Sequence, residues 1–541
     1  MSVARSSLWM AGGTTISRVL GFARSVILAA AIGVTTNAAD AFGVANQLPN
    51  NVYAIIVGGL LNAVLVPQIV KARSNKDGGK GYVDRLLTLI ITVFFAITLV
   101  ATLAAPFLVS IYTTGWSDQQ LALATAFAYW CLPQLFFYGL YSILGEVLNA
   151  RSAFGPYMWA PVLNNVVSLI GLGAFVILFG ADPTGSRAVE SWGPAQISLL
   201  AGTATAGVAS QALILLFAWK RIGMKLNLNF KWRGFGLRPA LKAASWSLGM
   251  VVVTQIGGLV QTIVASSAVS GRANNPAIAS VAAAAIAWLI FMLPHSVATV
   301  SIATSYFTRM SKHAHENRID LLKNDLAAGL RAISVISVFA TFALIVLAYP
   351  VSRVFVGEFA ATAALGNVLI ALMFGLVPFS FVFMMQRAFF SLEDTRTPFW
   401  FTVVQISMHI AGALTIAATV PAAQIVVALS ALTSVTILVQ AVIAYILLSR
   451  RIGSLSEHRI TQATTQFAIS GFLSATVGWL VLQLFGGLVE NAFAVDTVIS
   501  SILTIGIVGF VMLAVYIVAL RLLRVTEVDT VLAALKGILR R

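Results

Sequence analysis

Long apolar runs dominate this sequence and restrict what it can fold into. Fourteen stretches reach about 20 residues or more, the length that an α-helix needs to cross the hydrocarbon core of a bilayer. They span residues 8–33, 40–70, 84–112, 120–149, 157–180, 194–219, 244–269, 277–308, 328–351, 361–390, 398–419, 421–449, 463–487 and 496–520. Only 10% of the 541 residues are charged, against about 25% in soluble domains. We therefore expect an all-α polytopic membrane protein with about 14 transmembrane helices.

The basic residues test this count, because cytoplasmic loops of membrane proteins are enriched in lysine and arginine. With fourteen helices, 29 of the 34 Lys and Arg residues fall on one side of the membrane. Three lie on the other side, at Arg187, Arg272 and Arg353, and two lie inside the first run. The alternation predicts that both termini are cytoplasmic. It also places the net charge of +16 in short loops rather than on a nucleic-acid-binding surface.

The two ends of the chain carry further signals. "NAADA" (Asn37 to Ala41) has the small residues of a signal-peptide cleavage site, but the preceding stretch is long and contains Arg18 and Arg24. We therefore expect a retained helix. The tail resembles a capped amphipathic helix, with a capping box at Thr526–Asp529. It is typical either of a helix that lies on anionic lipid or of an ordinary cytoplasmic tail helix.

Two passages about 242 residues apart look alike. "LNARSAFGPYMWAPVLNNVV" begins at Leu148 and "FSLEDTRTPFWFTVVQISMH" begins at Phe390. Each connects two apolar runs through a polar turn and a proline. This predicts two six-helix lobes in parallel repeat plus two C-terminal helices, and such repeats are typical of transporters with a substrate site between the halves. The predicted boundaries are 1–225 and 226–455 for the lobes, 456–523 for the extra helices and 524–541 for the tail helix.

The first apolar run contains two arginines, in "SRVLGFAR". Each costs roughly 2.5–3.5 kcal/mol at the centre of a membrane helix. At 100° per residue, Ser17, Arg18, Gly21, Arg24 and Ser25 share an arc of about 120°. Because the apolar residues take the opposite arc, one face of this helix is expected to meet a polar environment. We favour a water-filled cavity with a positive wall, which suits a phosphate-bearing substrate because arginine binds phosphate in a bidentate way.

Other polar residues in the apolar runs are candidates for the same cavity. Their positions are Asp40, Gln47, Asn51, Gly58 and Asn62 in the second run and Glu146 and Asn149 at the end of the fourth. Three structural explanations compete with a substrate site. Arg24 can snorkel to an interface, Arg18 can form an ion pair with Glu146, and the asparagines can hydrogen-bond between helices.

Patterns that carry catalysis or metal binding are absent from the sequence. The histidines, His295, His313, His315, His409 and His458, show no metal-ligand spacing with carboxylates or with Cys131. The sequence also has no nucleotide-binding fingerprint and no nucleophile elbow. Cys131 is the single cysteine, so it forms no intrachain disulfide and is expected to pack in the membrane. We expect transport without a cofactor, a metal ion or ATP hydrolysis, and no enzyme activity.

Several blocks of the sequence resemble the MurJ/MviN family of lipid II flippases, within the multidrug/oligosaccharidyl-lipid/polysaccharide exporter superfamily. They are "SRVLGFAR" (17–24), "DAFGVANQLPN" (40–50), "VP" (66–67), "LNARSAFGPYMWAPVLNN" (148–165), "LPHSVATVSIAT" (293–304) and "QRAFFSLEDTRTP" (386–398). The resemblance implies a multi-pass protein of the bacterial plasma membrane that alternates between inward-open and outward-open states. Its substrate would be lipid II, an undecaprenyl-pyrophosphate-linked disaccharide-pentapeptide, translocated from the cytoplasmic to the outer leaflet.

The resemblance also implies roles for particular residues. Arg18 and Arg24 match the cavity arginines of the family, which are assigned to the pyrophosphate region, and Asp40 matches its acidic residue. The two C-terminal helices would form a groove for the lipid tail. The complete predicted substrate-binding set is Ser17, Arg18, Arg24, Asp40, Asn50, Asn51, Tyr53, Glu146 and Asn149.

This chain departs from the family pattern, and the departures keep other functions open. Tyr53 stands where many members have a basic residue, and Val57 stands where many have an acidic one. The run "AIAWLIFMLP" before His295 carries no charge, although many members have an arginine there. A second hypothesis is therefore an exporter for another polyprenyl-linked oligosaccharide or a drug-like substrate. A third is a scaffold that binds cell-wall synthesis proteins through the basic loops 220–242 and 309–331.

Overall fold

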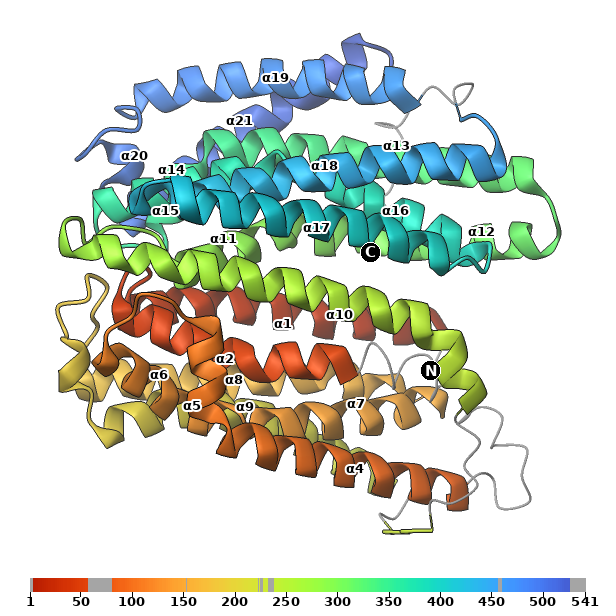
Figure 1. Cartoon of the computed structure of the whole chain (residues 1–541). Coiled ribbons are helices and arrows are strands. Elements are labelled where there is room, and N and C mark those ends of the chain that lie inside the picture. The colour runs from red at the N-terminus through yellow and green to blue at the C-terminus, as the bar shows by residue number, and fades with distance from the viewer. Residues whose placement is uncertain are drawn as a thin grey trace. The chain divides into compact units, whose positions relative to one another are not determined.

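The computed structural model of the chain describes residues 3–56, 80–151, 153–221, 223, 227–231, 238–455 and 460–525. Over these ranges the chain forms helices joined by loops, and no β-strand (Figure 1). Twelve helical segments of the described chain are long and apolar enough to cross a membrane, and a bent pair, Phe359–Met373 and Leu376–Ser391, makes a thirteenth. The predicted run 40–70 begins in helix α2 (Asn37–Ile56) and then leaves the described residues. The all-α polytopic fold is thus confirmed.

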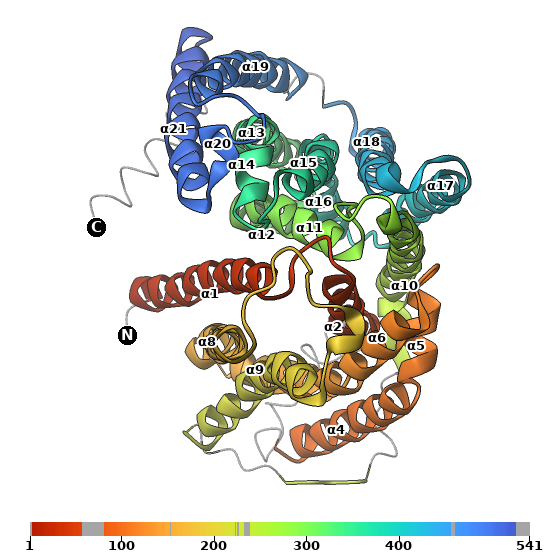
Figure 2. The same ribbon diagram turned by 90° about the vertical axis from the view of Figure 1, so that its left-hand side faces the viewer.

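The chain divides into two compact units, and the first is Met1–Ser270. Its further helices are α1 (Val3–Ile32), α4 (Lys80–Leu103), α5 (Ala105–Tyr112), α6 (Asp118–Cys131), α7 (Gln134–Ala150), α8 (Phe154–Phe179), α9 (Pro194–Arg221) and α10 (Arg238–Ser267). Helix α8 packs between α1 and α9 (Figure 2).

Helix α10 packs with the first unit, although the sequence repeat assigns it to the second lobe. The side chain of Gln255 donates to the carbonyl of Asn51 at 2.9 Å. The hydroxyl of Ser266 accepts from the backbone N–H of Thr114 at 2.9 Å. These hydrogen bonds explain why the compact units divide after Ser270 and not after residue 225. The division into repeated lobes at residue 225 stays a prediction.

The second unit is Gly271–Arg541. Its helices are α11 (Val281–Pro294), α12 (Val300–His315), α13 (Ile319–Val346), α14 (Ala348–Arg353), α15 (Phe359–Met373), α16 (Leu376–Ser391), α17 (Arg396–Thr419), α18 (Ile425–Ile452), α19 (Ile460–Leu484), α20 (Phe493–Asp496) and α21 (Val498–Leu522). A π-helical turn, His295–Thr299, joins α11 to α12. The predicted tail helix 524–541 lies almost wholly outside the described residues.

Among the described residues, each unit contains a membrane-spanning segment whose α-helix is interrupted near its middle. The break between α6 and α7 lies at Leu132–Pro133, and the break between α15 and α16 bends the segment by 43°. In the first unit Thr205 of α9 donates its hydroxyl to the carbonyl of Trp130 at 2.6 Å. In the second, Ser434 of α18 donates to the carbonyls of Ala371 and Leu372 at 2.8 and 3.0 Å. A break in a membrane helix leaves backbone carbonyls that need hydrogen-bond donors. In both units a hydroxyl from a neighbouring helix donates to carbonyls at the break, and this similarity supports the internal repeat.

The two C-terminal helices, α19 and α21, pack on each other and on α13 (Figure 2). The hydroxyl of Ser474 donates to the carbonyl of Met512 at 2.7 Å, and that of Tyr516 donates to the carbonyl of Val335 at 2.9 Å. A side chain on Gly478 would lie 2.5 Å from Met512, so the glycine permits this close approach. Their outer faces are apolar and exposed, as at Leu484 (85%), which fits helices surrounded by lipid.

The loop between α8 and α9 is held by a short network around Asp182. The carboxylate accepts hydrogen bonds from the backbone and hydroxyl of Ser186, both at 2.7 Å, and from the backbone of Arg187 at 2.9 Å. Burial alone would raise the pKa of Asp182, but these hydrogen bonds outweigh it and hold that pKa below its ordinary value. The guanidinium of Arg187 lies over the rings of Phe175 and Trp192.

Candidate functional site

The polar arc of α1 is divided between packing and the two arginines. Asn165 of α8 donates to the carbonyl of Ser17 at 2.7 Å, and a Cβ on Gly21 would lie 3.6 Å from the same amide. Ser17 and Gly21 therefore fit α1 against α8. Arg18 and Arg24 are both partly buried. The arc was correctly expected to meet polar groups, but part of it meets a neighbouring helix.

Arg24 lies beside a polar row on α7. It is close enough to Cys131 and Tyr138 to interact with them electrostatically. The hydroxyl of Tyr138 donates to Gln134 Oε1 at 3.3 Å, and Gln134 Nε2 donates to Asn46 Oδ1 of α2 at 3.2 Å. The hydrogen bond between Gln134 and Asn46 links α7 to α2, and Tyr138 of the same row lies within electrostatic range of Arg24 on α1.

Tyr53 of α2 extends this row towards Glu146. Its hydroxyl hydrogen-bonds with that of Ser142, and its ring centroid lies 5.2 Å from that of Tyr138. Glu146 lies within electrostatic range of Tyr53. We call Arg24, Gln134, Tyr138, Tyr53, Ser142 and Glu146 the N-terminal polar cluster. It unites three of the predicted site residues, Arg24, Tyr53 and Glu146, within one compact unit.

Neither Arg18 nor Arg24 is neutralised by an acidic side chain of the described chain. The described ion pairs are confined to the hairpin of α12 and α13. The proposed ion pair between Arg18 and Glu146 is therefore not formed in this structure. A partly buried guanidinium without a counter-ion is costly. The arrangement is therefore suited to an anionic ligand.

The other predicted residues of α2 lie in different environments. Asp40 is fully buried in the first turn of the helix (0% exposed), so its carboxylate does not line an open cavity. Asn50 is exposed. The side chain of Asn51 donates to the hydroxyl of Tyr112 at 3.1 Å, which is an interhelical hydrogen bond. The N-terminal polar cluster therefore brings none of these three residues together with Arg24.

His295 of the second unit is buried and has a hydrogen-bonding partner. It begins the π-helical turn after Pro294 and is 2% exposed. Its Nδ1 lies 3.2 Å from the hydroxyl of Ser380, which also accepts from Thr299 at 3.1 Å. Rings of Phe379 and Phe383 surround it, with centroids 4.5 and 5.2 Å away. These contacts describe a packed histidine of the second unit.

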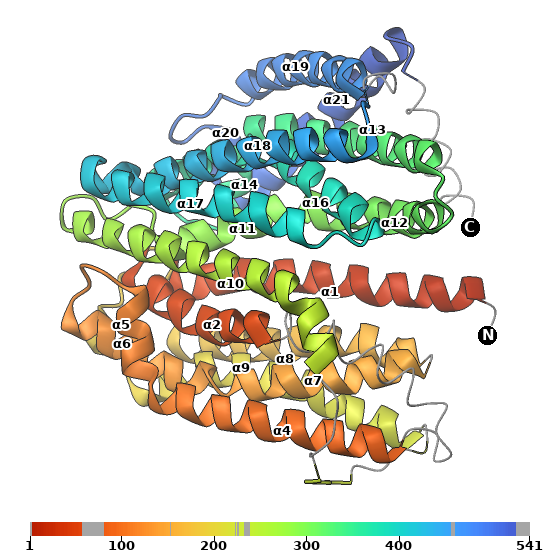
Figure 3. The same cartoon turned by 45° about the vertical axis from the view of Figure 1, so that its right-hand side comes forward.

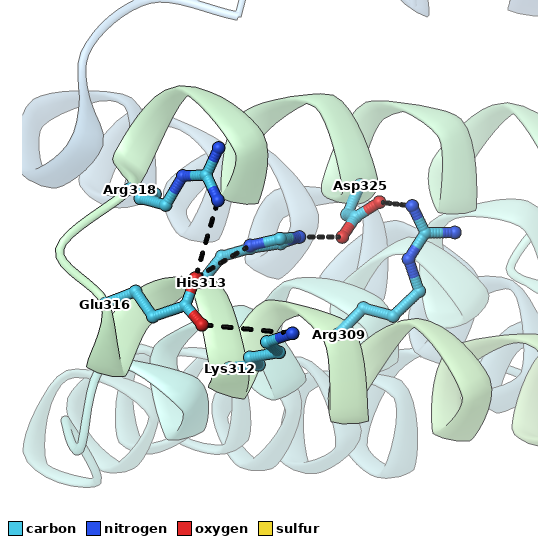
Figure 4. Close-up of polar contacts among 6 residues, drawn as sticks. All are labelled: Arg309, Lys312, His313, Glu316, Arg318 and Asp325. Atoms are coloured by element: carbon cyan, nitrogen blue, oxygen red, sulfur yellow. Dashed lines mark ion pairs between the residues drawn. The ribbon is translucent and has the colours of Figure 1, made fainter.

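A charged cluster joins α12 to α13 at the end of their hairpin (Figure 4). Asp325, 4% exposed, is the centre of this cluster. Its two oxygens lie 2.5 Å from Arg309 Nη2 and 3.3 Å from His313 Nε2. Glu316 lies 3.7 Å from Arg318 and 3.9 Å from Lys312. Much of the basic charge in the loop 309–331 is therefore used within the hairpin, which weakens the scaffold hypothesis for this loop.

Three members of the N-terminal polar cluster were not predicted from the sequence. Gln134, Tyr138 and Ser142 follow one another at four-residue intervals in the predicted run 120–149, so they share a helix face. This periodic polar row is the pattern that indicates them. Asn46 and Asn165 are also recognisable as polar residues within apolar runs, but their partners depend on tertiary packing. Among the described residues, no group of three His, Cys, Asp or Glu side chains is placed to hold a metal ion.

Comparison with known proteins decides the family. A family model described as "Lipid II flippase MurJ" matches residues 28–494, which is most of the chain. The chain belongs to the MurJ lipid II flippase family. A relative from Rhizobium tropici named "Probable lipid II flippase MurJ" is 26% identical over 545 residues, which cover 99% of this chain and 97% of the relative.

Solved structures of two transporters share the fold of this chain. A lipid II flippase MurJ in an inward closed conformation superimposes with a TM-score of 0.70 at 17% identity, and the match covers 94% of this chain and 98% of the other. An inward-facing multidrug resistance MATE family transporter matches with a TM-score of 0.59 at 17% identity, over 81% of this chain and 99% of its own. The resemblance found in the sequence motifs is thus confirmed.

Proposed function

We propose that this chain is a flippase that carries lipid II from the cytoplasmic to the outer leaflet of a bacterial plasma membrane. Membership of the MurJ family supports the substrate class. The observation that carries the site is the pair Arg18 and Arg24, which have no acidic partner among the described side chains. Guanidinium groups in this situation bind a pyrophosphate through charge-assisted hydrogen bonds.

The N-terminal polar cluster positions Arg24 for this role. Tyr138 lies beside it and is held by Gln134, which is in turn held to Asn46 on α2. Tyr138, which lies within electrostatic range of Arg24, is therefore held in a row that connects α7 to α2. The undecaprenyl chain stays in the bilayer while the headgroup moves past Arg18 and Arg24.

Alternating access is the transport cycle that we infer for this chain. Its support is the folding of the chain into two compact units, each with one broken membrane helix. A ligand or ion drives such a cycle only if it binds the two states with different affinity. Both termini lie in the cytoplasm under this proposal, as the distribution of lysine and arginine indicates.

A second candidate function keeps the fold and changes the cargo. Tyr53 occupies a position where many family members carry a basic residue, and its hydroxyl is bound to Ser142. The site therefore has an aromatic surface where those members have a cation. A polyprenyl-linked oligosaccharide with another headgroup is the alternative cargo that this difference favours.

Depletion of the chain in its own bacterium tests the proposal and separates the two cargoes. We expect lipid II to accumulate in the inner leaflet and to disappear from the outer leaflet within a few generations. Accessibility of lipid II to an extracellular lipid II-cleaving toxin measures this directly. If lipid II still reaches the outer leaflet at the normal rate while another lipid-linked oligosaccharide accumulates, the second candidate replaces the first.

A further inference from the structure

Helices α17 and α18 are joined by a polar seam inside the membrane. They run side by side in the second unit (Figures 1 and 3). The seam residues on α17 are Thr402, Gln405 and His409, and those on α18 are Thr433, Thr436 and Gln440. All six are buried. The spacing is i, i+3, i+7 on both helices, so each set lies on one face.

Two residue pairs across this seam are joined by hydrogen bonds. Gln440 Nε2 donates to the hydroxyl of Thr402 at 3.2 Å. Gln405 Nε2 donates to the hydroxyl of Thr436 at 3.2 Å. Because consecutive spans joined by a short turn are antiparallel, the next pair of residues that face each other in the same register is His409 and Thr433.

This third pair, His409 and Thr433, is not hydrogen-bonded. The hydroxyl of Thr433 donates instead to the carbonyl of Leu429 in its own helix, at 2.8 Å. The imidazole of His409 is 3% exposed, and neither ring nitrogen has a hydrogen-bond partner in the described chain. By contrast His295, 2% exposed, has its Nδ1 beside Ser380. Burying an imidazole without hydrogen-bond partners costs free energy, which points to a role for His409 other than stabilising the fold.

No charged side chain of the described chain provides an interaction partner for His409. Helices α18 and α16 pack on α17. The titratable or charged groups on these helices are Arg387, Tyr445, Arg450 and Arg451. Arg387 lies over the rings of Phe307 and Phe383, and no charged group of the described chain acts electrostatically on His409. His409 also lies about 20 Å along α17 from Arg396, close to the middle of a bilayer core of about 30 Å.

We propose that His409 is a proton-binding site that couples proton uptake to the transport cycle. This inference rests on the proposed function for its coupling part only. An imidazolium in the closed seam would be a buried charge without a counter-ion. Proton uptake from water therefore requires α17 and α18 to separate at His409, and the proton then favours the separated arrangement. A ligand that binds two states differently shifts their populations, which is the requirement for coupling.

Proton binding is tested on the full chain in lipid nanodiscs by NMR of ring-¹⁵N-labelled histidine. One imidazole resonance should be absent in His409→Gln and should change from neutral to doubly protonated between about pH 8 and pH 5, where histidine titrates. If that imidazole stays neutral across this range, the proposal is wrong. His409→Asn provides the assignment if His409→Gln does not fold, and an unchanged His295 resonance reports correct folding of either variant.

Coupling is tested by the pH dependence of lipid II flipping in proteoliposomes. For wild type we expect the rate to change by up to about tenfold between pH 7.5 and 5.5, following the protonated fraction of an imidazole. His409→Gln should abolish that dependence, whereas the matched buried control His295→Asn should retain it. A wild-type pH profile in His409→Gln would overturn the coupling. If the chain flips no lipid II but His409 binds a proton, the proposed function fails and the proton site stands.

Discussion

At the residue scale, the membrane arginines illustrate what a sequence pattern can and cannot specify. The helical arc around Arg18 and Arg24 predicted a polar environment, and the structure places Arg24 beside Tyr138. The arc did not show that Ser17 would instead accept a hydrogen bond from Asn165. Asp40 was predicted in the substrate-binding set, but it is fully buried. A helical wheel gives the direction of a side chain, whereas its neighbour is decided by tertiary packing.

Asp182 provides a prediction about stability and pH at this scale. Its folded-state pKa is below the ordinary 3.8, so its stabilising effect is fully present above that value. The effect is lost as pH falls through the lower, folded-state pKa. Asp182→Asn should lower the free energy of unfolding by about 1–2 kcal/mol at neutral pH, through loss of charge-assisted hydrogen bonds.

The measurement is thermal unfolding of wild type and Asp182→Asn in the same detergent between pH 3 and 7, the range above and below ordinary carboxyl pKa values. The difference in melting temperature should shrink towards the acidic end. Glu190→Gln, an exposed acid in the same loop, is the matched control and should differ little from wild type at every pH. A difference that grows on acidification would contradict the assignment.

At the element scale, the apolar runs predicted most of the helices because length and hydropathy suffice for that purpose. The breaks at Leu132–Pro133 and beside Gly375 were not predicted, although Pro133 marks the first of them. Pattern alone also missed the π-helical turn at His295, because π-helical turns leave no periodic trace in sequence. The repeat at Leu148 and Phe390 was predicted from loop motifs. The broken helices add a second, structural argument for it.

Hydroxyls at these breaks should stabilise the protein. Ser434→Ala removes a donor to the carbonyl of Ala371 and one of the donors to the carbonyl of Leu372, which keeps the backbone N–H of Gly375. Thr205→Val removes the donor to the carbonyl of Trp130. Each substitution should lower the free energy of unfolding by about 1–3 kcal/mol, since a carbonyl without a partner inside a membrane carries a desolvation cost. Thermal unfolding in nanodiscs measures the loss. Thr415→Val, whose exposed hydroxyl bonds only within its own helix, should be close to wild type. Equal effects from all three would exclude a special role for the breaks.

At the scale of the whole molecule, composition and charge distribution predicted a polytopic membrane protein, the internal repeat predicted a transporter, and the comparisons confirmed the family that the motifs indicated. The division at Ser270 was not predicted, because the packing of α10 depends on hydrogen bonds to Asn51 and Thr114 that no local pattern encodes. Tyr53 was predicted in the site, but its contacts with Tyr138 and Ser142 were not, since they form only when α2 and α7 meet. Family-level function is thus accessible from motifs, whereas the supporting contacts of the site require the structure.

The central claim is that Arg18 and Arg24, which have no acidic partner in the described part of the chain, bind the pyrophosphate of lipid II during translocation. Flipping of lipid II in proteoliposomes, followed by its accessibility to a membrane-impermeant probe, tests it most directly. Loss of a charge-assisted contact of about 1.5–3 kcal/mol predicts that Arg24→Ala lowers the rate by about 10- to 100-fold. Arg521→Ala, which removes an exposed arginine at the end of α21, should keep the wild-type rate. Flipping by Arg24→Ala at the wild-type rate would contradict the account.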